Sequence, residues 1–221
     1  MLTILFRILL ALAVLPLLLI VAYRWIDPPL TPLMVIRWAG GAAIDHRPIP
    51  LEAVAPALPR AIIASEDNRF CTHAGIDFDA VRDAIDEQEE TGRLRGASTV
   101  TMQVARNLFL WPGGGFVRKA VEAPLALAID ALWPKRRVME VYLGIAEWGD
   151  GVFGAEAAAR RHFRKPAVRL TRTEAARLAA VLPNPRRWNA AVPTAYIQRR
   201  TATIDGRVNQ LGPAGVACVD P

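Results

Sequence analysis

Residues 95–122 read RGASTVTMQVARNLFLWPGGGFVRKAVE, and this stretch decides how the rest of the chain is interpreted. It predicts a helix, a break and a second helix. Ser98 or Thr99 can cap the first helix, because a hydroxyl oxygen accepts hydrogen bonds from the free amide groups of a helix N-terminus. The sequence WPGGG over residues 111–115 ends that helix, and the second is expected to begin near Phe116.

Both predicted helices carry a polar motif. The residues on one face of the first helix are four and seven positions apart, namely Thr99, Gln103 and Arg106. In the second helix Arg118 and Glu122 lie one turn apart, with Lys119 beside them. Alone, such a pair is typical of an exposed ion pair on a solvated helix. The stretch as a whole, with its glycine-rich turn, makes a functional site the better interpretation.

The N-terminal segment ILFRILLALAVLPLLLIVAY, residues 4–23, contains a single charge, Arg7, close to one end. About twenty apolar residues are enough to cross a bilayer, and an arginine near the end of such a helix can reach the interface. A cleaved signal peptide is the competing interpretation, but VAYRWIDPPL offers no convincing small-residue cleavage site. We therefore expect an uncleaved anchor, with the chain after it outside the cytoplasm.

These features divide the chain into four expected parts. They are a membrane anchor (1–25), a linker and membrane-proximal segment (26–48), a globular domain (49–190) and a C-terminal tail (191–221). The polar, Gly- and Pro-containing tail has no assigned structure, and its end is expected to be partly disordered.

The 221-residue chain is basic, with a net charge of +6 and a pI near 10. A positive net charge suits binding to phosphates, anionic lipid headgroups or nucleic acid. The expected location of the chain outside the cytoplasm argues against nucleic acid. Basic clusters recur through the later half at 118–119, 135–137, 160–161, 164–165 and 186–187. Each alone is typical of a solvated face, and together they could lie against an anionic membrane.

Two cysteines, Cys71 and Cys218, are too few for a disulfide framework and lack metal-ligand spacing, so no metal cage is indicated. They could pair in an oxidising compartment. The simpler expectation is that Cys71 is a small buried residue, because Cys218 lies in the tail.

Most of the remaining chain is predicted to be helical, which implies an all-α domain. The expected helices are Pro59–Asp67, Phe78–Glu90, Glu122–Trp133, Val138–Ile145, Glu156–Phe163 and one that a capping box at Thr171–Glu174 opens and Pro183 ends. The apolar positions expected to face the core are Phe78, Val81 and Ile85 in one helix and Leu125, Ile129 and Leu132 in another. Strand-like alternation is weak, at 33–38 and 43–50.

Glu66 lies near the C-terminal end of its predicted helix. A carboxylate there meets the negative end of the helix dipole, which favours its use as a general base. An exposed acidic end of an amphipathic helix is the alternative, and one glutamate cannot exclude it.

Four spaced segments resemble the motifs of the peptidoglycan glycosyltransferases of the family 51 type, which polymerise lipid II. In chain order they are EDNRF at 66–70 with His73 and Gly75, GAST at 96–99 with Gln103 and Asn107, RKAVE at 118–122, and KRRVMEVY at 135–142. They are similar to the family's ED-x-x-F-x-x-H-x-G, G-x-S-T-x-x-Q-Q, R-K-x-x-E and K-x-x-I-L-x-x-Y-x-N motifs. Four motifs in the right order are far more specific than any one of them.

The resemblance implies a lysozyme-like, two-lobed helical domain with an N-terminal transmembrane helix. Without a long C-terminal extension for a transpeptidase, the chain resembles the monofunctional form. The implied location is the bacterial inner membrane, with one membrane pass and a periplasmic catalytic domain. The implied partners are lipid II, the growing glycan chain, the membrane and proteins of the divisome or of cell-wall synthesis.

The resemblance also implies roles for individual residues. Glu66 is the base that takes a proton from the acceptor 4-hydroxyl, and Glu122 orients the substrate or a divalent ion, Mg²⁺ or Mn²⁺, near the pyrophosphate. No tightly bound cofactor is indicated. The cations expected to hold donor phosphates are Arg106, which occupies the family's usual lysine position, Arg118 and Lys119. The other expected substrate-binding residues are Asp67, Ser98, Thr99, Gln103 and Asn107.

Three departures from the family pattern bear on activity. Met102 replaces the first glutamine of the Q-Q pair, Gly144 replaces an asparagine, and Gly114 stands where relatives often carry arginine. A catalytically weak scaffold that binds lipid II would explain them. A lytic, glycan-cleaving enzyme is a third possibility, although such an enzyme has no need of the R-K-x-x-E motif.

Overall fold

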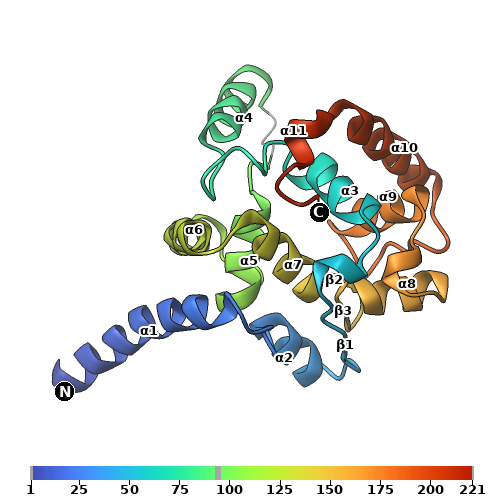
Figure 1. Cartoon of the computed structure of the whole chain (residues 1–221). Coiled ribbons are helices and arrows are strands. Elements are labelled where there is room, and N and C mark those ends of the chain that lie inside the picture. The colour runs from blue at the N-terminus through green and yellow to red at the C-terminus, as the bar shows by residue number, and fades with distance from the viewer. Residues whose placement is uncertain (1, 93–95, 221) are drawn as a thin grey trace.

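The computed structural model describes residues 2–92 and 96–220, which are mostly helical (Figure 1). Arg95, the first residue of the stretch quoted above, lies outside the described residues. The α-helices are α1 (Leu2–Tyr23), α2 (Pro32–Ala39), α3 (Ala57–Glu66), α4 (Phe78–Thr91), α5 (Val100–Phe109), α6 (Gly115–Leu132), α7 (Lys135–Ile145), α8 (Ala155–Phe163), α9 (Arg172–Val181), α10 (Ala195–Gln210) and α11 (Gly212–Val216). Two 3-10 helices, η1 (Leu51–Ala53) and η2 (Ala167–Arg169), complete the helical elements of these residues.

A small sheet adds to the helices and was not expected of an all-α domain. Its strands β1 (Asp45–His46), β2 (Glu147–Gly149) and β3 (Val152–Phe153) have the order β1-β3-β2. β1 is parallel to β3, and β2 is antiparallel to it. The weak alternation at 43–50 contains β1, whereas residues 33–38 lie in α2 and the strand expected there is wrong.

Capping explains why α2 forms where alternation suggested a strand. The Thr31 hydroxyl oxygen accepts a hydrogen bond from Met34 N at 3.3 Å, and Pro32 occupies the first helical position. Proline is favoured there because it has no amide hydrogen to satisfy. The predicted caps at Thr99 and at Thr171 with Glu174 are confirmed for α5 and α9.

The core joins two groups of helices. α3 packs against α9 and α10, while α5 packs against α6 and α7. The inner face of α5 is apolar, and Val100, Val104 and Ala105 are fully buried. Burying large aliphatic side chains contributes about 1.5–3 kcal/mol each, so such contacts hold α5 against α6 and α7. The last residue of α3 meets the middle of α5 where Gln103 Nε2 donates a hydrogen bond to Glu66 Oε2 at 3.1 Å.

Two of the predicted core stripes are only partly right. In α4 Phe78 and Ile85 are exposed and Ala84 is the buried residue. In α6 Ile129 is fully buried, whereas Leu132 is 38 % exposed. α4 projects beside the body of the protein (Figure 1). Its regularly spaced apolar side chains therefore have no second helix packed over all of them within the described residues.

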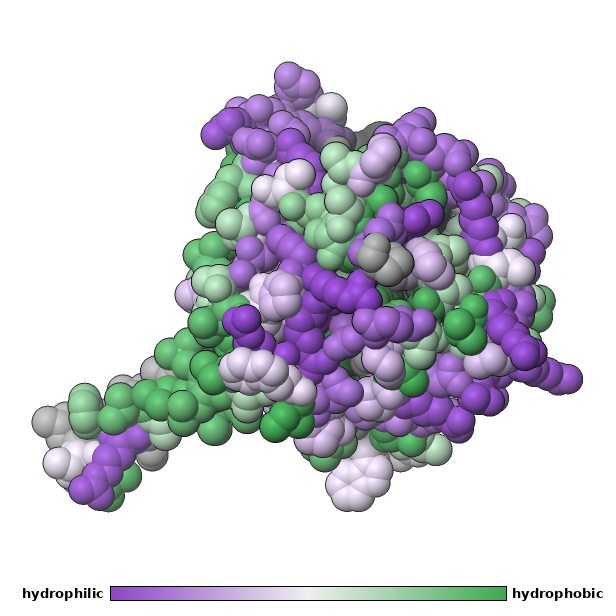
Figure 2. Space-filling view, in the orientation of Figure 1, coloured by the Kyte–Doolittle hydropathy of each residue, from purple (hydrophilic) through white to green (hydrophobic). Residues whose placement is uncertain are grey.

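α1 extends away from the body and contacts it through its C-terminal end (Figure 1). Trp133 Nε1 donates a hydrogen bond to Ile20 O at 2.7 Å, and Arg137 Nε donates one to Tyr23 O at 3.0 Å. Apolar side chains cover much of the visible surface of the arm (Figure 2). No helix within residues 2–92 and 96–220 reaches the length and apolarity needed to cross a bilayer, which was expected of residues 4–23.

The C-terminal segment is folded as far as Asp220, although the sequence left it unassigned. Thr194 caps α10, and Ile197 and Ile204 are buried in the core. Cys71 and Cys218 form a disulfide with Cα atoms 5.5 Å apart, so Cys71 is not a free buried thiol. The bond ties the end of the chain to the loop that follows α3.

We expect the double substitution Cys71→Ser and Cys218→Ser to lower the free energy of unfolding by about 2–4 kcal/mol. The bond joins residues 147 positions apart, so its loss enlarges the unfolded ensemble considerably. Urea unfolding of the oxidised protein and of the variant measures the difference. Addition of a reductant should lower the midpoint of the oxidised protein and leave the variant unchanged; equal midpoints of the two oxidised samples would contradict the prediction.

Candidate active site

Glu66 lies at the junction of the two helix groups and is held by a short chain of hydrogen bonds. Gln103 Nε2 donates to Glu66 Oε2 at 3.1 Å, and Tyr142 OH donates to Gln103 Oε1 at 3.3 Å. Burial raises the pKa of the Tyr142 phenol well above 10, and the charge of Glu66 raises it further, so the phenol stays a donor. The amide oxygen of Gln103 therefore accepts the hydrogen bond from Tyr142, and the amide nitrogen of Gln103 points toward the Glu66 carboxylate.

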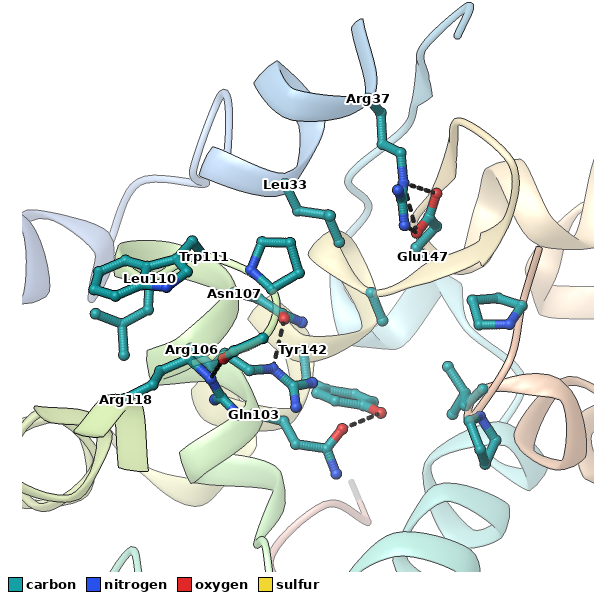
Figure 3. A pocket seen from close by; sticks show the side chains of 16 residues that line it. Leu33, Arg37, Gln103, Arg106, Asn107, Leu110, Trp111, Arg118, Tyr142 and Glu147 are labelled. Carbon is teal, nitrogen blue, oxygen red and sulfur yellow. Dashed lines mark hydrogen bonds and ion pairs between the residues drawn. The ribbon is translucent and has the colours of Figure 1, made fainter. Parts of the chain in front are cut away.

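A cavity of about 320 Å³ opens on one side of this chain, and we call it the α5 cavity. It lies among α2, α5, the loop at 110–113 and α7 (Figure 3). The predicted site residues on its wall are Gln103, Arg106, Asn107 and Arg118. Within the described residues, the Arg106 side chain makes one hydrogen bond, from Nε to Asn107 Oδ1 at 3.4 Å. Most of its donors are therefore available to an anion in the cavity.

Arg118 and Glu122 form a pair on α6 at the edge of the α5 cavity. Arg118 Nη1 bonds Glu122 Oε2, and Arg118 Nε donates to Gly113 O in the glycine-rich turn. Only 1 % of the Glu122 side chain is exposed, so the solvated ion pair considered from the sequence is not what forms. Glu122 Oε1 is buried without a hydrogen-bond partner within the described residues. Lys119 is exposed and does not line the cavity.

The environment of Glu122 disfavours its charge. Burial raises the pKa of the Glu122 carboxyl above 4.5, and nearby positive charges oppose the rise only in part. Those positive charges belong to Arg118, Arg106 and Lys119. The wall of the α5 cavity carries Arg37, Arg106 and Arg118 against Glu147, which gives the cavity a net positive charge suited to an anionic ligand.

We expect the unfolding free energy to fall as the pH rises through the range just above 4.5, in part because of Glu122. Between its unfolded pKa and its raised folded pKa, the folded protein holds more protons, so raising the pH favours the unfolded state. Urea unfolding of the native protein and of Glu122→Gln, from about pH 4 to about pH 7, isolates this contribution. The stability of the native protein relative to the variant should decline across this range, and a flat or rising difference would contradict the prediction.

A second cavity, of about 550 Å³, lies on the other side of Glu66, and we call it the α4 cavity. α4 and the segment that precedes α5 form much of its wall. Glu66, Asp67, Ser98 and Thr99 all line it. Because Gln103 lines the α5 cavity and donates to Glu66, the two cavities meet at this hydrogen bond.

Asp67 and Thr99 are buried and hold backbone segments together. The Asp67 carboxylate accepts hydrogen bonds from His73 Nε2 at 2.9 Å and from Val100 N at 2.9 Å. The Thr99 hydroxyl donates to Gly75 O at 2.6 Å and accepts from Met102 N at 3.1 Å. These bonds fix the start of α5 against the end of α3, and so set the distance between Gln103 and Glu66.

Comparison with known proteins finds a family match over most of the chain. A sequence model of the family described as Transglycosylase matches residues 34–209. The chain belongs to the transglycosylase family. Because the match extends to residue 209, it includes most of α10, which the sequence alone left in the tail.

Several curated relatives in this family are named "Biosynthetic peptidoglycan transglycosylase". One from Rhodospirillum centenum is 59 % identical over 213 residues, which cover 95 % of this chain and 92 % of the relative. One from Caulobacter vibrioides is 45 % identical, covering 92 % of this chain and 90 % of the relative. One from Pseudomonas fluorescens is 48 % identical, covering 92 % of this chain and 87 % of the relative.

Two of the three departures from the family pattern have a structural explanation. Met102 is 7 % exposed and belongs to the core, so this position of α5 faces away from the cavities. Gly114 has φ +87°, and a Cβ there would lie 3.0 Å from Arg118 Cβ and 3.2 Å from Trp111 Nε1. A side chain at this position would therefore strain the turn that Arg118 closes. Nothing in the structure explains Gly144, where a Cβ would meet only Pro48 at 3.8 Å.

The structure adds site residues that sequence reasoning missed. Arg37 and Glu147 form a bidentate pair at the wall of the α5 cavity, with Nε–Oε1 and Nη2–Oε2 distances of 2.9 Å (Figure 3). Arg200 Nη2 lies 3.8 Å from Glu66 Oε1. These pairs join segments more than 100 residues apart, so no local pattern could have revealed them.

Proposed function

We propose that the protein polymerises the glycan strands of peptidoglycan by transferring the growing lipid-linked glycan onto the 4-hydroxyl of lipid II. The observation that carries the proposal is the position of Glu66, which lies where the α4 cavity meets the cation-lined α5 cavity. A base between an acceptor site and an anion site is what glycosyl transfer from a pyrophosphate requires.

The proposed reaction is a single displacement. The Glu66 carboxylate accepts the proton of the acceptor 4-hydroxyl, whose oxygen attacks C1 of the donor sugar. The bond between C1 and the pyrophosphate oxygen breaks, and polyprenyl pyrophosphate leaves with the electron pair. Direct displacement inverts the anomeric carbon, so an α-linked donor gives a β-1,4 glycan without a covalent enzyme intermediate.

Arg106 and Arg118 are the cations proposed to hold the donor pyrophosphate. Both line the α5 cavity, and guanidinium groups bind phosphate oxygens in bidentate geometry. Their positive charge counters the negative charge that develops on the leaving group. Gln103, Asn107 and Ser98 are proposed to contact the sugars or phosphates, since each lines one of the two cavities.

Glu122 is proposed to orient the pyrophosphate through Arg118, or a divalent cation that accompanies it. Its Oε1 is buried, has no hydrogen-bond partner in the described part of the chain, and is the kind of ligand atom that Mg²⁺ or Mn²⁺ accepts. One carboxylate oxygen beside the cavity suits a cation bound mainly by phosphate oxygens, which would neutralise charge on the leaving group.

We further propose that the protein acts at the outer face of the cytoplasmic membrane, where lipid-linked substrates are accessible. Trp25, just after α1, and Trp38, within α2, are 72 % and 70 % exposed, and tryptophan favours membrane interfaces. The disulfide between Cys71 and Cys218 supports an oxidising compartment, the periplasm. Proteins of cell-wall synthesis or division are the proposed partners there.

Incubation of detergent-solubilised protein with labelled lipid II tests the function. Product size on a gel and lysozyme sensitivity identify the reaction. We expect long, lysozyme-sensitive polymer to accumulate. Soluble fragments released from preformed glycan would favour a lytic enzyme, and bound lipid II without any product would favour a scaffold.

A further inference from the structure

A third cavity, of about 270 Å³, lies beside Glu66 and has a positively charged wall. α10 and Ser65 at the end of α3 form it, and we call it the α10 cavity. Its cationic residues are Arg199, Arg200 and Arg207. None of these arginines has a role in the mechanism proposed above.

The arginines of the α10 cavity have donors that the protein does not use. Within the described residues, the guanidinium groups of Arg199 and Arg207 form no hydrogen bond or ion pair. Arg200 Nε is buried and has no hydrogen-bond partner among the residues that the structure describes, and Arg200 Nη2 is 3.8 Å from Glu66 Oε1. A buried donor left unpaired costs free energy, so an anionic ligand in this cavity is the better explanation of the arrangement.

The α10 cavity adjoins the proposed acceptor site. Ser65 and Arg207 line both the α10 cavity and the α4 cavity, which contains Glu66. A substrate whose 4-hydroxyl lies at Glu66 therefore passes close to these guanidinium groups. An anionic group elsewhere on the same substrate can reach them.

The position of α10 indicates which anion of the substrate this is. α10 lies at the opposite end of the molecule from α1 and α2 (Figure 1). The exposed Trp25 follows α1, and the exposed Trp38 belongs to α2. The pyrophosphate of a lipid-linked acceptor is attached to the lipid and so stays on the membrane side. The other anionic groups of a peptidoglycan precursor are the carboxylates of its peptide stem, which can extend away from the membrane.

We propose that the α10 cavity binds a carboxylate of the acceptor's peptide stem and so positions the acceptor 4-hydroxyl at Glu66. This proposal rests on the polymerase function proposed above. Charge-assisted hydrogen bonds from guanidinium groups suit a carboxylate, and Tyr196 on the same wall offers a ring for the peptide to pack against. Arg199, Arg200 and Arg207 are thus positioning residues for the acceptor.

The kinetic test uses the double variant Arg199→Gln and Arg207→Gln. Both residues are exposed and unpaired within the described residues, so the fold should not depend on them. With intact lipid II we expect KM to rise about fivefold or more while kcat stays nearly constant. With lipid II whose stem carboxylates are amidated, the variant and the native protein should have the same KM. An equal rise in KM with both substrates, or an unchanged KM with each of them, would overturn the proposal.

A matched control and a binding test separate this proposal from the proposed function. Arg161→Gln removes an exposed arginine of α8 that lines none of the three cavities, and should behave like the native protein. A soluble disaccharide-peptide without lipid or pyrophosphate, titrated by calorimetry, should bind the double variant about fivefold more weakly.

Binding that depends on the arginines in a protein that makes no polymer would support the cavity's role and refute the polymerase. Polymer made equally well by the double variant, with unchanged binding of the disaccharide-peptide, would refute the cavity's role and leave the polymerase standing.

Discussion

Glu66→Gln is expected to lower glycan polymerisation by at least about a thousandfold while lipid II still binds. The substitution keeps the size of the side chain and removes the group that accepts the proton of the acceptor hydroxyl. Gln103 Nε2 donates to Glu66 Oε2, and the amide oxygen of a glutamine can accept the same bond. The fold and the two cavities should therefore survive. Initial rates of polymer formation and lipid II binding by the same preparation measure the two effects separately.

The matched control is Glu89→Gln, an exposed glutamate on α4. It removes the same charge from the surface and should leave the rate unchanged. If Glu66→Gln polymerised at a rate within about tenfold of the native protein, another group would have to be the base.

Arg118→Ala is expected to reduce polymerisation by about a hundredfold to a thousandfold and also to destabilise the fold. The rate falls because a cation of the α5 cavity is lost, and Arg118 also closes the turn at Gly113. The stability falls because Glu122 is left as a buried charge without its partner. Rates with lipid II and urea unfolding of the same variant measure both consequences.

A second substitution distinguishes these two effects. In the double variant Arg118→Ala and Glu122→Gln the unpaired charge is gone, so most of the lost stability should return while the activity stays low. Arg118→Lys keeps a positive charge without the planar fork and should recover part of the rate. Recovery of full activity in the double variant would show that Arg118 acts only through the fold.

Local sequence signals predicted the parts of the fold that local chemistry determines. The cap at Thr99, the break at 111–115 and the capping box at Thr171 with Glu174 are all confirmed. Each depends on side chains within a few residues of the backbone groups that they satisfy. The helix predicted over Pro59–Asp67 exists as Ala57–Glu66, but it begins two residues before Pro59 and has no side-chain cap, so the signal on which its predicted start rested is wrong.

Packing between distant segments accounts for what the sequence did not reveal. α10 has a local signal, the Thr194 cap followed by buried positions at Ile197, Thr201 and Ile204, but its polar composition hid that spacing. The exposure of Phe78 and Ile85 depends on whether another element covers α4, which spacing along one helix cannot show.

The candidate site was predictable to different degrees. Glu66, Gln103 and Arg118 were found through their motifs. The structure places Glu66 and Gln103 where the two cavities meet and Arg118 on the wall of the α5 cavity. That Asp67 is buried and bonded to the backbone of α5 could not be read from the motif, because this contact joins residues 33 positions apart. The nearness of Arg200 to Glu66 likewise arises only when α10 folds against α3.

The configuration of the first glycosidic bond made from lipid II is the sharpest test of a single displacement with Glu66 as the base. Detergent-solubilised protein is incubated with α-linked lipid II, the new linkage is assigned by proton NMR, and released polyprenyl pyrophosphate is counted. Single displacement at Glu66 gives a β-1,4 bond and one pyrophosphate for each bond formed, and we expect both products from the native protein and neither from Glu66→Gln. An α bond, or glycan cleaved without release of pyrophosphate, would contradict it.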